Sequence, residues 1–538
     1  MNKYWKIFSI LIIIISIIFI LGLKRNILIK EENTEPIYVA GIINHHLLAK
    51  DIIDKFFKEL SKFKYDNIVL LSPDHFNSCS LYGKSFLFKE DSQLAIDKDH
   101  GIGNLLPTIK QIWPMANIIP VLVCDKEGNL PDGILESKNT LVIASVDFSH
   151  YLPERLMNLH DDKSISDISN FIKDLSIDVD CPRCVKIVND FAANKKAINI
   201  LEIGRSNSFL YNKSNDPKDG TSYYSVIFSK ASTSFQAKKS KTFLFVGDMM
   251  LARGVRARID EKGFDYLLGN AREAFNGVDY VIGNLEGPIV QDAPAVPNNS
   301  LSFSFDEDVI NFLNKYKFDI LSLANNHTNN YNGKEGYNST VKLLKENSID
   351  YIGHYSSCEK SYSYNNDGNY FIAFNLTFGD NGCSKTILKN IEDIKKENPN
   401  SFIILYPHWG EEYKTTSNSF QQKLAHKFID AGANLIIGSH PHVVQEVELY
   451  KNKLIFYSLG NFIFDQYFSK ETQQGLMIGL NKENAKLIYY IIPLSEQRSS
   501  VNFFNNEESR NFLKDLAKRS SKDLTIMIEG GKIELTNN

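Results

Sequence analysis

The chain has little cysteine and little net charge, and both shortages exclude classes of protein. Its 538 residues include only six cysteines, too few for a fold held together by disulfides. The formal net charge at pH 7 is −4 and the basic residues form no stripe, so no nucleic acid is expected as a partner. An internal repeat and long low-complexity segments are also missing, which argues against a repeat protein. The length predicts two or three ordinary globular domains.

Long apolar runs are missing after residue 30, but the N-terminus holds one. The run Phe8–Leu23 lies between basic residues and, with its neighbours, is at the short end for a membrane span. A secretory signal peptide shares the charged start and apolar middle, but no small-x-small cleavage site follows here. We therefore expect residues 1–30 to form an uncleaved, single-pass anchor in the cell membrane, with the soluble domains outside the cytoplasm. A cleaved signal peptide is the alternative.

The remaining chain divides into two α/β series and a tail. Apolar, strand-like runs alternate with amphipathic segments over residues 36–230, which predicts an α/β domain. Residues 231–241 are small, polar and basic, as in a linker. A second α/β series covers residues 242–495, and its last strands follow one another without helices, which predicts an antiparallel portion. Residues 496–538 form a C-terminal extension with one amphipathic helix.

Short polar clusters follow the strand-like runs of the second series. In open α/β sheets, ligands collect outside the carboxyl ends of strands, so these side chains are expected to converge. The candidate ligands of a divalent metal are Asp248, Glu286, Asn326, His408, His440 and His442. Carboxylate, carboxamide and imidazole donors suit Mn, Fe or Zn, as one ion or two. Two ions would hold a phosphoryl group and activate water.

Other polar residues of these clusters are expected to complete the site. His327 lies beside a candidate ligand and can donate a proton to a leaving oxygen, so it is the candidate catalytic residue. Asn284, Glu412 and Asn461 are expected to line the site.

The ordered set of clusters resembles the CapA family of capsule or poly-γ-glutamate synthesis proteins, a branch of the calcineurin-like metallophosphatase superfamily. The motifs that carry the resemblance are Gly247–Met250, Gly283–Pro288, Ala324–His327, His408–Tyr413, Gly438–Val443 and Tyr457–Phe462. The resemblance implies a four-layer α/β/β/α sandwich with a metal site at one edge. Met250 stands where the wider superfamily has a histidine, and Asn284 stands where it has an aspartate. These departures leave a single metal ion as an alternative to two.

Polar residues also follow strand-like runs in the first series, namely His45, His75, Asp147 and His150. Cys181 opens a C-x-x-C pair that fits a disulfide, a redox pair or half of a metal site. Two imidazoles and a thiolate suit Zn, Fe or Cu.

This first half resembles the Memo family, which includes protein B of the AmmeMemoRadiSam system and is related to LigB-type extradiol dioxygenases. The resemblance implies a three-layer α/β domain. It also implies His45, His75 and Cys181 as a second metal site, lined by Asp147 and His150. One motif is eroded, because Gly103 replaces the usual glutamate. Both an active domain and a degenerate partner domain therefore remain open.

The sequence thus predicts a membrane-anchored protein that acts in the synthesis of extracellular capsule, poly-γ-glutamate or another envelope polymer. The expected activity is metal-dependent hydrolysis of the phosphoesterase type, on a polyanionic polymer or a phosphoester, with polymer synthetases as possible partners. One alternative is a non-catalytic component that binds or exports the polymer. Another is a redox metalloprotein that acts through the Memo-like half.

Overall fold

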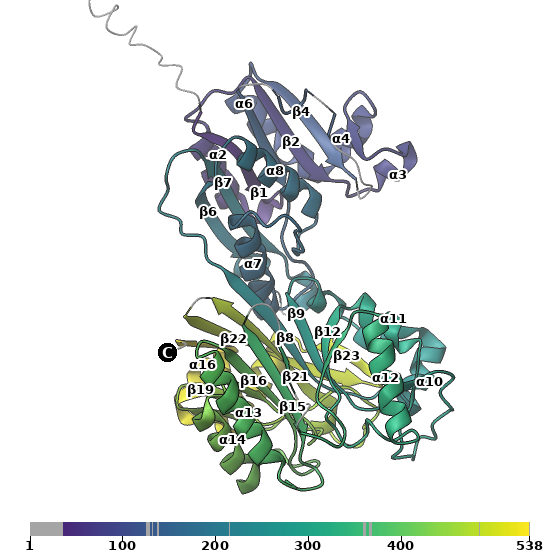
Figure 1. The fold of residues 1–538 in the computed structure, drawn as a ribbon. Helices are drawn as coiled ribbons and strands as arrows, with labels where there is room; N and C mark the ends of the chain where they lie inside the picture. The colour runs from purple at the N-terminus through teal and green to yellow at the C-terminus, as the bar shows by residue number, and fades with distance from the viewer. Residues whose placement is uncertain are drawn as a thin grey trace, which may run out of the picture.

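The computed structural model of the chain shows two α/β domains that meet at helix α7 (Glu154–Ser169) (Figure 1). It describes residues 36–124, 130–131, 133–136, 139–212, 214, 216–358, 362–364, 368–483 and 485–536. Within these ranges, none of the helices has the length and apolar character that a membrane span requires. The predicted anchor, residues 1–30, lies outside the described residues.

The first domain is built on a seven-stranded mixed sheet, as far as the structure describes it. The strand order is β3-β4-β2-β5-β1-β7-β6. The strands are β1 (Tyr38–Ile43), β2 (Asn67–Pro73), β3 (Phe86–Phe88), β4 (Asn117–Val123), β5 (Thr140–Ser145), β6 (Asn199–Asn207) and β7 (Ser222–Ser229). The central four, β4, β2, β5 and β1, run parallel, so their carboxyl ends meet at one edge of the sheet.

Helices cover both faces of this sheet and give the domain three layers. Helix α2 (Lys50–Leu60) packs into the core on one face, and helix α8 (Pro182–Asn194) packs into the core on the other. Shorter helices are α3 (Ser78–Tyr82), α4 (Gln93–Lys98), α5 (His100–Gly103), α6 (Leu106–Ile112) and α9 (Ser208–Asn212). The predicted α/β domain with three layers is confirmed, while its kinship with the Memo fold stays a prediction.

The second domain contains two facing sheets. The described part of the larger sheet has nine strands: β8 (Ser240–Met249), β9 (Tyr280–Leu285), β12 (Phe318–Ser322), β13 (Asp350–Ile352), β20 (Asn461–Ile463), β21 (Gln474–Glu483), β22 (Lys486–Gln497), β23 (Ser500–Phe503) and β24 (Lys532–Thr536). Strands β13, β12, β9 and β8 are parallel, whereas β21 to β24 pair antiparallel. The predicted antiparallel portion is therefore confirmed.

The smaller sheet has six strands among the described residues, in the order β14-β15-β16-β17-β19-β18. They are β14 (Tyr362–Tyr364), β15 (Asn369–Asn375), β16 (Phe402–His408), β17 (Leu435–Ile437), β18 (Val447–Tyr450) and β19 (Lys453–Phe456). A short pair, β10 (Ile289–Val290) and β11 (Phe305–Asp306), lies apart from both sheets.

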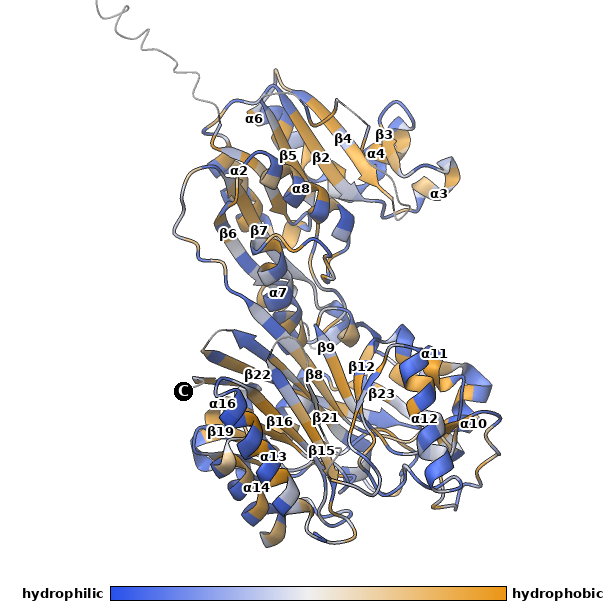
Figure 2. Cartoon of the chain, viewed as in Figure 1, coloured by the Kyte–Doolittle hydropathy of each residue, from blue (hydrophilic) through white to orange (hydrophobic). Residues whose placement is uncertain are grey.

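Side chains from both sheets share one core, and helices pack on the outer faces. Phe245 and Ile282 of the larger sheet and Ile404 of the smaller one belong to this core. Helices α10 (Arg253–Lys262), α11 (Val309–Lys315) and α12 (Lys334–Glu346) cover the larger sheet, and helices α13 (Cys383–Glu397) and α14 (Ser419–Ala431) cover the smaller. Figure 2 shows the hydrophobic strands, such as β12 and β21, enclosed by these helices. The result is the expected α/β/β/α sandwich.

The last residues of the chain belong to the sandwich. Helices α15 (Asn506–Arg519) and α16 (Thr525–Gly530) contribute Leu513, Leu516 and Ile528 to the core between the sheets. Strand β24 pairs with β22. The segment expected as a C-terminal extension is thus an integral part of the second domain.

Helix α7 of the first domain packs directly on the second domain. Its apolar residues, including Leu156 and Leu159, share a core with the larger sheet. His160 of this helix is fully buried, with Nδ1 2.7 Å from Asp178 Oδ2 and Nε2 3.0 Å from the carbonyl oxygen of Ala274. These two contacts hold the ring between Asp178 of the first domain and Ala274 of the second. The domains are therefore joined by a packed interface as well as by the linker.

All six cysteines are paired, in the disulfides Cys79–Cys124, Cys181–Cys184 and Cys358–Cys383. Each bridge lies within one domain, so the fold rests on its hydrophobic cores, as the low cysteine content predicts. Of the three possibilities open for the C-x-x-C pair, the structure shows the disulfide.

Candidate metal centre

The six predicted ligands of the second domain converge where the carboxyl ends of the parallel strands meet. β8 and β9 deliver the carboxylates Asp248 and Glu286, and the loop after β12 delivers Asn326. β16 ends at His408, and the loop after β17 carries His440 and His442. Both sheets of the sandwich thus contribute to one site.

Asp248 is fixed by hydrogen bonds at the centre of this site. Its Oδ1 accepts from Asn284 Nδ2 at 2.8 Å, and its Oδ2 accepts from the backbone N–H of His440 at 3.1 Å. His442 Nδ1 lies 3.5 Å from the same Oδ2. Complete burial raises the pKa of Asp248 to about 7, because the carboxylate loses the water that would stabilise its charge.

Glu286 is the clearest sign that a cation belongs here. Its side chain is fully buried, and among the described residues no group donates a hydrogen bond to either carboxylate oxygen. Nitrogens of three imidazoles surround its Oε1 instead: His442 Nε2 at 3.6 Å, His327 Nε2 at 3.9 Å and His408 Nε2 at 4.0 Å. Burial, and then repulsion from Asp248, raise the pKa of Glu286 well above its usual value. An unpaired buried carboxylate facing imidazole nitrogens fits a divalent metal.

The histidine loop holds a backbone conformation that such residues seldom adopt. His440 has φ of 97° and His442 has φ of 58°, both in the left-handed region, where strain is usual at functional sites. Burial lowers the pKa of His440 to about 4 and that of His442 to about 3, so both rings are neutral and have a lone pair for a metal. His440 Nδ1 is buried without a hydrogen-bond partner among the described residues.

His408 and Asn326 complete the set of ligands. His408 Nε2 lies 2.7 Å from Asn326 Oδ1, and His408 Nδ1 lies 2.9 Å from Ser439 Oγ. Burial, reinforced by the neighbouring histidines, holds the pKa of His408 well below its usual range. A neutral imidazole and an amide oxygen side by side are a suitable pair of metal ligands.

His327 is held in one orientation by its neighbours. Its Nδ1 lies 2.7 Å from Asn330 Oδ1, which also accepts the backbone N–H of Phe303, so Nδ1 carries the ring proton. The ring stacks on Phe303 with centroids 4.2 Å apart, and the guanidinium of Arg253 covers the same Phe303 ring. Nε2 therefore faces Glu286, where a proton could be exchanged with a bound group.

Of the three residues expected to line the site, Asn284 and Asn461 are buried and Glu412 is exposed. Asn284 holds Asp248, as described above, and Asn461 Oδ1 lies 3.0 Å from His442 Nδ1. Glu412 lies at the rim, where one of its oxygens is within 4.8 Å of ring nitrogens of His440 and His442. Asn461 therefore orients a ligand rather than acting as one.

A second cluster lies at the carboxyl ends of β1, β2 and β5 in the first domain. It brings His45 and His75 together with His100, and His45 together with Asp147 and Asp180. Burial lowers the pKa of His45 to about 4. For His75, hydrogen bonds to Asp180 and Asp99 outweigh the opposing effect of burial and raise the pKa to about 9.

Cys181 departs from the prediction. Its sulfur is bonded to Cys184 and belongs to the hydrophobic core beneath α8, so it offers no thiolate to a metal. His150, also expected at this site, pairs through its backbone with Thr221 and stands outside the metal-binding groups found among the described residues. Asp147 is buried beside His45, as expected, and burial raises its pKa.

Asp180 and His100 were not predicted as members of this cluster. His100 belongs to the motif in which Gly103 replaces the usual glutamate. The sequence marks that motif as eroded and so did not predict a ligand from it. Asp180 directly precedes the C-x-x-C pair, so its position next to Cys181 was the available signal.

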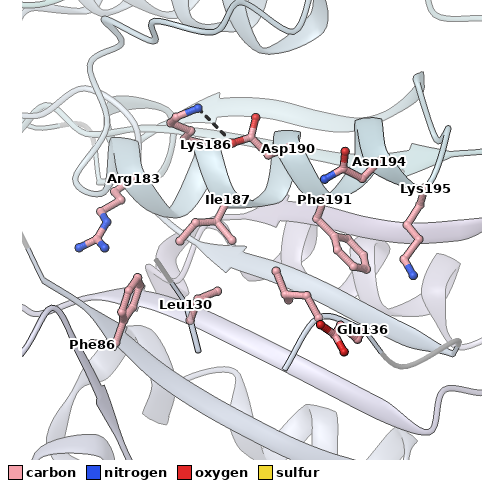
Figure 3. A pocket seen from close by; sticks show the side chains of 11 residues that line it. Phe86, Leu130, Glu136, Arg183, Lys186, Ile187, Asp190, Phe191, Asn194 and Lys195 are labelled. Carbon is pink, nitrogen blue, oxygen red and sulfur yellow. Dashed lines mark hydrogen bonds and ion pairs between the residues drawn. The ribbon is translucent and has the colours of Figure 1, made fainter. Parts of the chain in front are cut away.

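One hollow of the described surface lies away from both histidine clusters. It has a volume of about 560 Å³ and is bounded by helix α8, Leu130, Leu135 and Glu136 (Figure 3). Ile187 and Phe191 give it apolar walls, and Lys186 forms an ion pair with Asp190 at its margin. None of its lining residues belongs to either histidine cluster, so the chemistry of the clusters does not extend to it.

Comparison with known proteins identifies relatives of the second domain. Residues 242–466 match the family model "Bacterial capsule synthesis protein PGA_cap", a range that includes every predicted residue of this site from Asp248 to Asn461. The "Capsule biosynthesis protein CapA" of Bacillus anthracis is 31% identical over 322 residues, which cover 55% of this chain and 78% of the relative. The "PGA biosynthesis protein CapA" of Bacillus subtilis (strain 168) is 29% identical over 309 residues, which cover 54% and 80%.

Among solved structures, purple acid phosphatase PPD1 from yellow lupin (Lupinus luteus) seeds matches with a TM-score of 0.26 and 10% identity, over 54% of this chain and 62% of that one. So low a score carries no argument. The sequence relatives show the family, because one relative above 30% identity is matched over more than two thirds of its length. The chain therefore belongs to the CapA family of bacterial capsule synthesis proteins.

Proposed function

We propose that the second domain is a metal-dependent hydrolase of the phosphoesterase type that acts in the synthesis of a capsule polymer. The observation that carries this proposal is Glu286, a buried carboxylate that no group among the described residues hydrogen-bonds and that three imidazole nitrogens face. Such a constellation is costly in an empty site and favourable around a divalent cation.

The residues that would hold the metal are those of the converging loops: Asp248, Glu286, Asn326, His408, His440 and His442. When bound, a divalent ion polarises a phosphoryl oxygen and activates water. Asn284 stands at the position where the wider superfamily has an aspartate, and its amide nitrogen donates a hydrogen bond to Asp248. A donor in that position cannot bridge two cations, so we propose one tightly held ion of Mn, Fe or Zn.

His327 would hold and release the proton that the leaving oxygen needs. The acceptor Asn330 keeps one proton on Nδ1, so Nε2 is the nitrogen that would take up a second proton and pass it to the leaving oxygen. Asn461 fixes the ring of His442 in the same way, through Nδ1. These hydrogen bonds orient the imidazoles before a substrate arrives, as catalysis requires.

The substrate and location follow from the family and the cysteines. The relatives are named for capsule and PGA biosynthesis, which supports an extracellular polyanionic polymer or a phosphoester derived from one. Disulfides persist in oxidising compartments, so three of them support domains outside the cytoplasm, held to the membrane by residues 1–30. The Memo-like nature of the first domain is part of the same proposal, supported by its three layers.

The test compares two buried glutamates of the second domain. We expect the purified full chain to contain bound metal and to hydrolyse bis(p-nitrophenyl) phosphate. Glu286→Gln should lose both properties, because an amide cannot balance the charge of the ion. The matched control Glu496→Gln, a buried carboxyl bonded to the backbone N–H of Ser499, should keep both.

His327→Ala separates catalysis from binding. It should keep the metal and lose roughly 10²–10⁴-fold in turnover, the usual contribution of a general acid. Unchanged hydrolysis in Glu286→Gln contradicts the metal site. A full complement of metal without hydrolysis of any phosphoester contradicts the enzyme and favours the polymer-binding or export component.

A further inference from the structure

An exposed pair of aromatic side chains lies beside the candidate metal centre of the second domain. Tyr413 and Phe468 come from different loops, yet their ring centroids are 5.1 Å apart and the rings are nearly perpendicular, at 83°. Tyr413 is 44% exposed and Phe468 is 67% exposed, so both rings keep much of their surface open to solvent. The Tyr413 ring also lies 6.2 Å from the ring of the candidate ligand His442. We call Tyr413 and Phe468 the aromatic corner.

The backbone holds Tyr413 in a conformation that bulky residues rarely adopt. Its φ is 63°, in the left-handed region. Its backbone N–H donates to the carbonyl oxygen of Pro441 at 2.8 Å, and Pro441 separates the candidate ligands His440 and His442. Strain of this kind persists where the surrounding structure over-determines it, and it is concentrated at ligand-binding sites. The position of the tyrosine ring is therefore set by the loop that supplies two of the histidines.

A chain of hydrogen bonds connects the aromatic corner to a candidate metal ligand. Asn461 Oδ1 lies 3.0 Å from His442 Nδ1, and the amide nitrogen of Asn461 donates to Gln466 Oε1 at 3.1 Å. The amide nitrogen of Gln466 in turn donates to the hydroxyl oxygen of Tyr413 at 3.3 Å. Gln466 lies two residues before Phe468 in the same loop, so this chain connects both rings of the corner to the metal centre.

The charges around the aromatic corner disfavour an anionic group. Glu411 and Glu412 directly precede the tyrosine and are both exposed, and the same loop sets one base, Lys414, against them. The charge of Arg253, which stacks on the aromatic ring behind the candidate acid, is balanced by an ion pair with Asp465. A carboxylate or a second phosphate placed on the two rings would therefore be repelled by Glu412.

We propose that the aromatic corner is a subsite for a neutral sugar ring, esterified to the phosphate that the metal centre binds. This inference rests on the proposed function and names its substrate class, a glycosyl phosphoester rather than a polyanionic chain. The C–H face of a sugar packs on an aromatic ring, and its hydroxyls pair with polar groups placed around that ring. The carboxylate of Glu412 and the amide of Gln466 are such groups, and a purely apolar substituent would use neither of them.

The experiment compares two phosphate monoesters that differ only in the esterified group, α-D-glucose 1-phosphate and methyl phosphate. Each is titrated by calorimetry into the full chain loaded with Mn(II) and carrying His327→Ala, so that neither ligand is hydrolysed. Methyl phosphate measures binding at the metal centre, and the ratio of the two affinities measures the subsite. We expect glucose 1-phosphate to bind about 10-fold more tightly, the effect of one ring packed on an aromatic face. α-D-Glucuronic acid 1-phosphate, the same ring with a carboxylate, should bind more weakly than glucose 1-phosphate.

Variants of the aromatic corner separate ring packing from metal binding. Phe468→Ala and Tyr413→Ala should each lower the affinity ratio toward one, while the metal content and the affinity for methyl phosphate stay unchanged. Phe468→Tyr, which keeps an aromatic ring, should keep the preference. The matched control is Tyr151→Ala in the first domain, at a tyrosine with φ of 61° that is 60% exposed, and it should leave the ratio unchanged. Should Tyr413→Ala fail to fold by circular dichroism, Phe468→Ala decides the question from an exposed position.

Several outcomes would overturn the inference. Equal affinities for methyl phosphate and glucose 1-phosphate would show that the corner holds no ring, and they would leave the metal-dependent function standing. A preference that survives Phe468→Ala would place the ring elsewhere. Tighter binding of glucuronic acid 1-phosphate would show an anionic ring, and tighter binding of uridine 5′-monophosphate would assign the corner to a nucleobase. If methyl phosphate itself does not bind to the metal-loaded chain, the proposed function fails and this inference fails with it.

Discussion

At the scale of single residues, the convergence of the candidate ligands of the second-domain site was predictable because each follows a strand that the sequence marks as apolar. Asp248, Glu286 and His408 could be placed at one edge from this rule alone. The rule says nothing about partners behind the ligands. Asn330, which orients His327, belongs to a loop whose path depends on tertiary packing, so the sequence could not assign it.

One half-buried carboxyl outside both sites lowers the stability of the fold at neutral pH. Asp319 on β12 accepts the backbone N–H of Val281 at 2.7 Å, and burial raises its pKa to about 6, above the unfolded value of about 3.9. The folded state binds this proton more tightly, so stability falls as pH rises from about 4 to 6 and stays lower above that range.

Asp319→Asn should therefore stabilise the protein above pH 6 by about 1–2 kcal/mol, because an amide keeps the acceptor and carries no charge. Below pH 4 the variant and the parent should unfold at the same temperature, since the carboxyl is then protonated in both states. Differential scanning calorimetry at pH 4 and pH 7.5 measures the difference. Equal stabilisation at both pH values would show that the charge is not the cause.

At the scale of elements, local pattern was a good guide and long-range pairing was not. The apolar pattern over residues 419–431 predicts a helix, and α14 covers Ser419–Ala431 with an Asn418–Gln421 capping box at its start. The division at residue 495 does not match a structural boundary, because β22 continues to Gln497 and then pairs with β24. Periodicity within a window contains no information about which distant strand will pair.

Removal of residues 504–538 should leave the second domain insoluble. Leu513, Leu516, Leu524 and Ile528 are fully buried in the core between the sheets, and their loss would expose the apolar faces that they cover. Size-exclusion chromatography of the soluble fraction measures the outcome. Asn505→Ala, which removes only the capping box of α15, should cost about 1 kcal/mol and remain soluble. A monodisperse truncated protein would show that the segment is a separable extension.

At the scale of the whole molecule, the sequence predicts two domains joined by a linker, and the structure shows them packed together. The interface depends on helix α7, whose residues Leu156, Met157 and Leu159 belong to the core of the second domain, while Ile168 at its other end belongs to that of the first. Leu159 lies against Gly479 of β21, where an added Cβ would come within 2.6 Å of it. A helix that packs on a neighbouring domain has the same apolar periodicity in its sequence as a helix that packs on its own domain.

Leu159→Ala should weaken this interface. Deletion of a fully buried leucine side chain costs about 2–5 kcal/mol, depending on how far the cavity collapses. We expect a lower unfolding temperature and faster amide hydrogen exchange in both α7 and β21. Leu210→Ala, at a position 65% exposed, is the matched control and should change neither. Equal behaviour of the two variants would show that the domains are held by the linker alone.

The pairing of β8 also sets the order in which the protein can assemble. On one side β8 lies against β9, which follows soon after it, but on the other side Phe245 lies opposite Ile478 of β21. Contacts between such distant residues close large loops and form late during folding. Strand β20, which pairs with Asp248, also comes from this late part of the chain. A growing polypeptide therefore has no complete set of candidate ligands until nearly all of it has been synthesised, so a metal would be captured only late in folding.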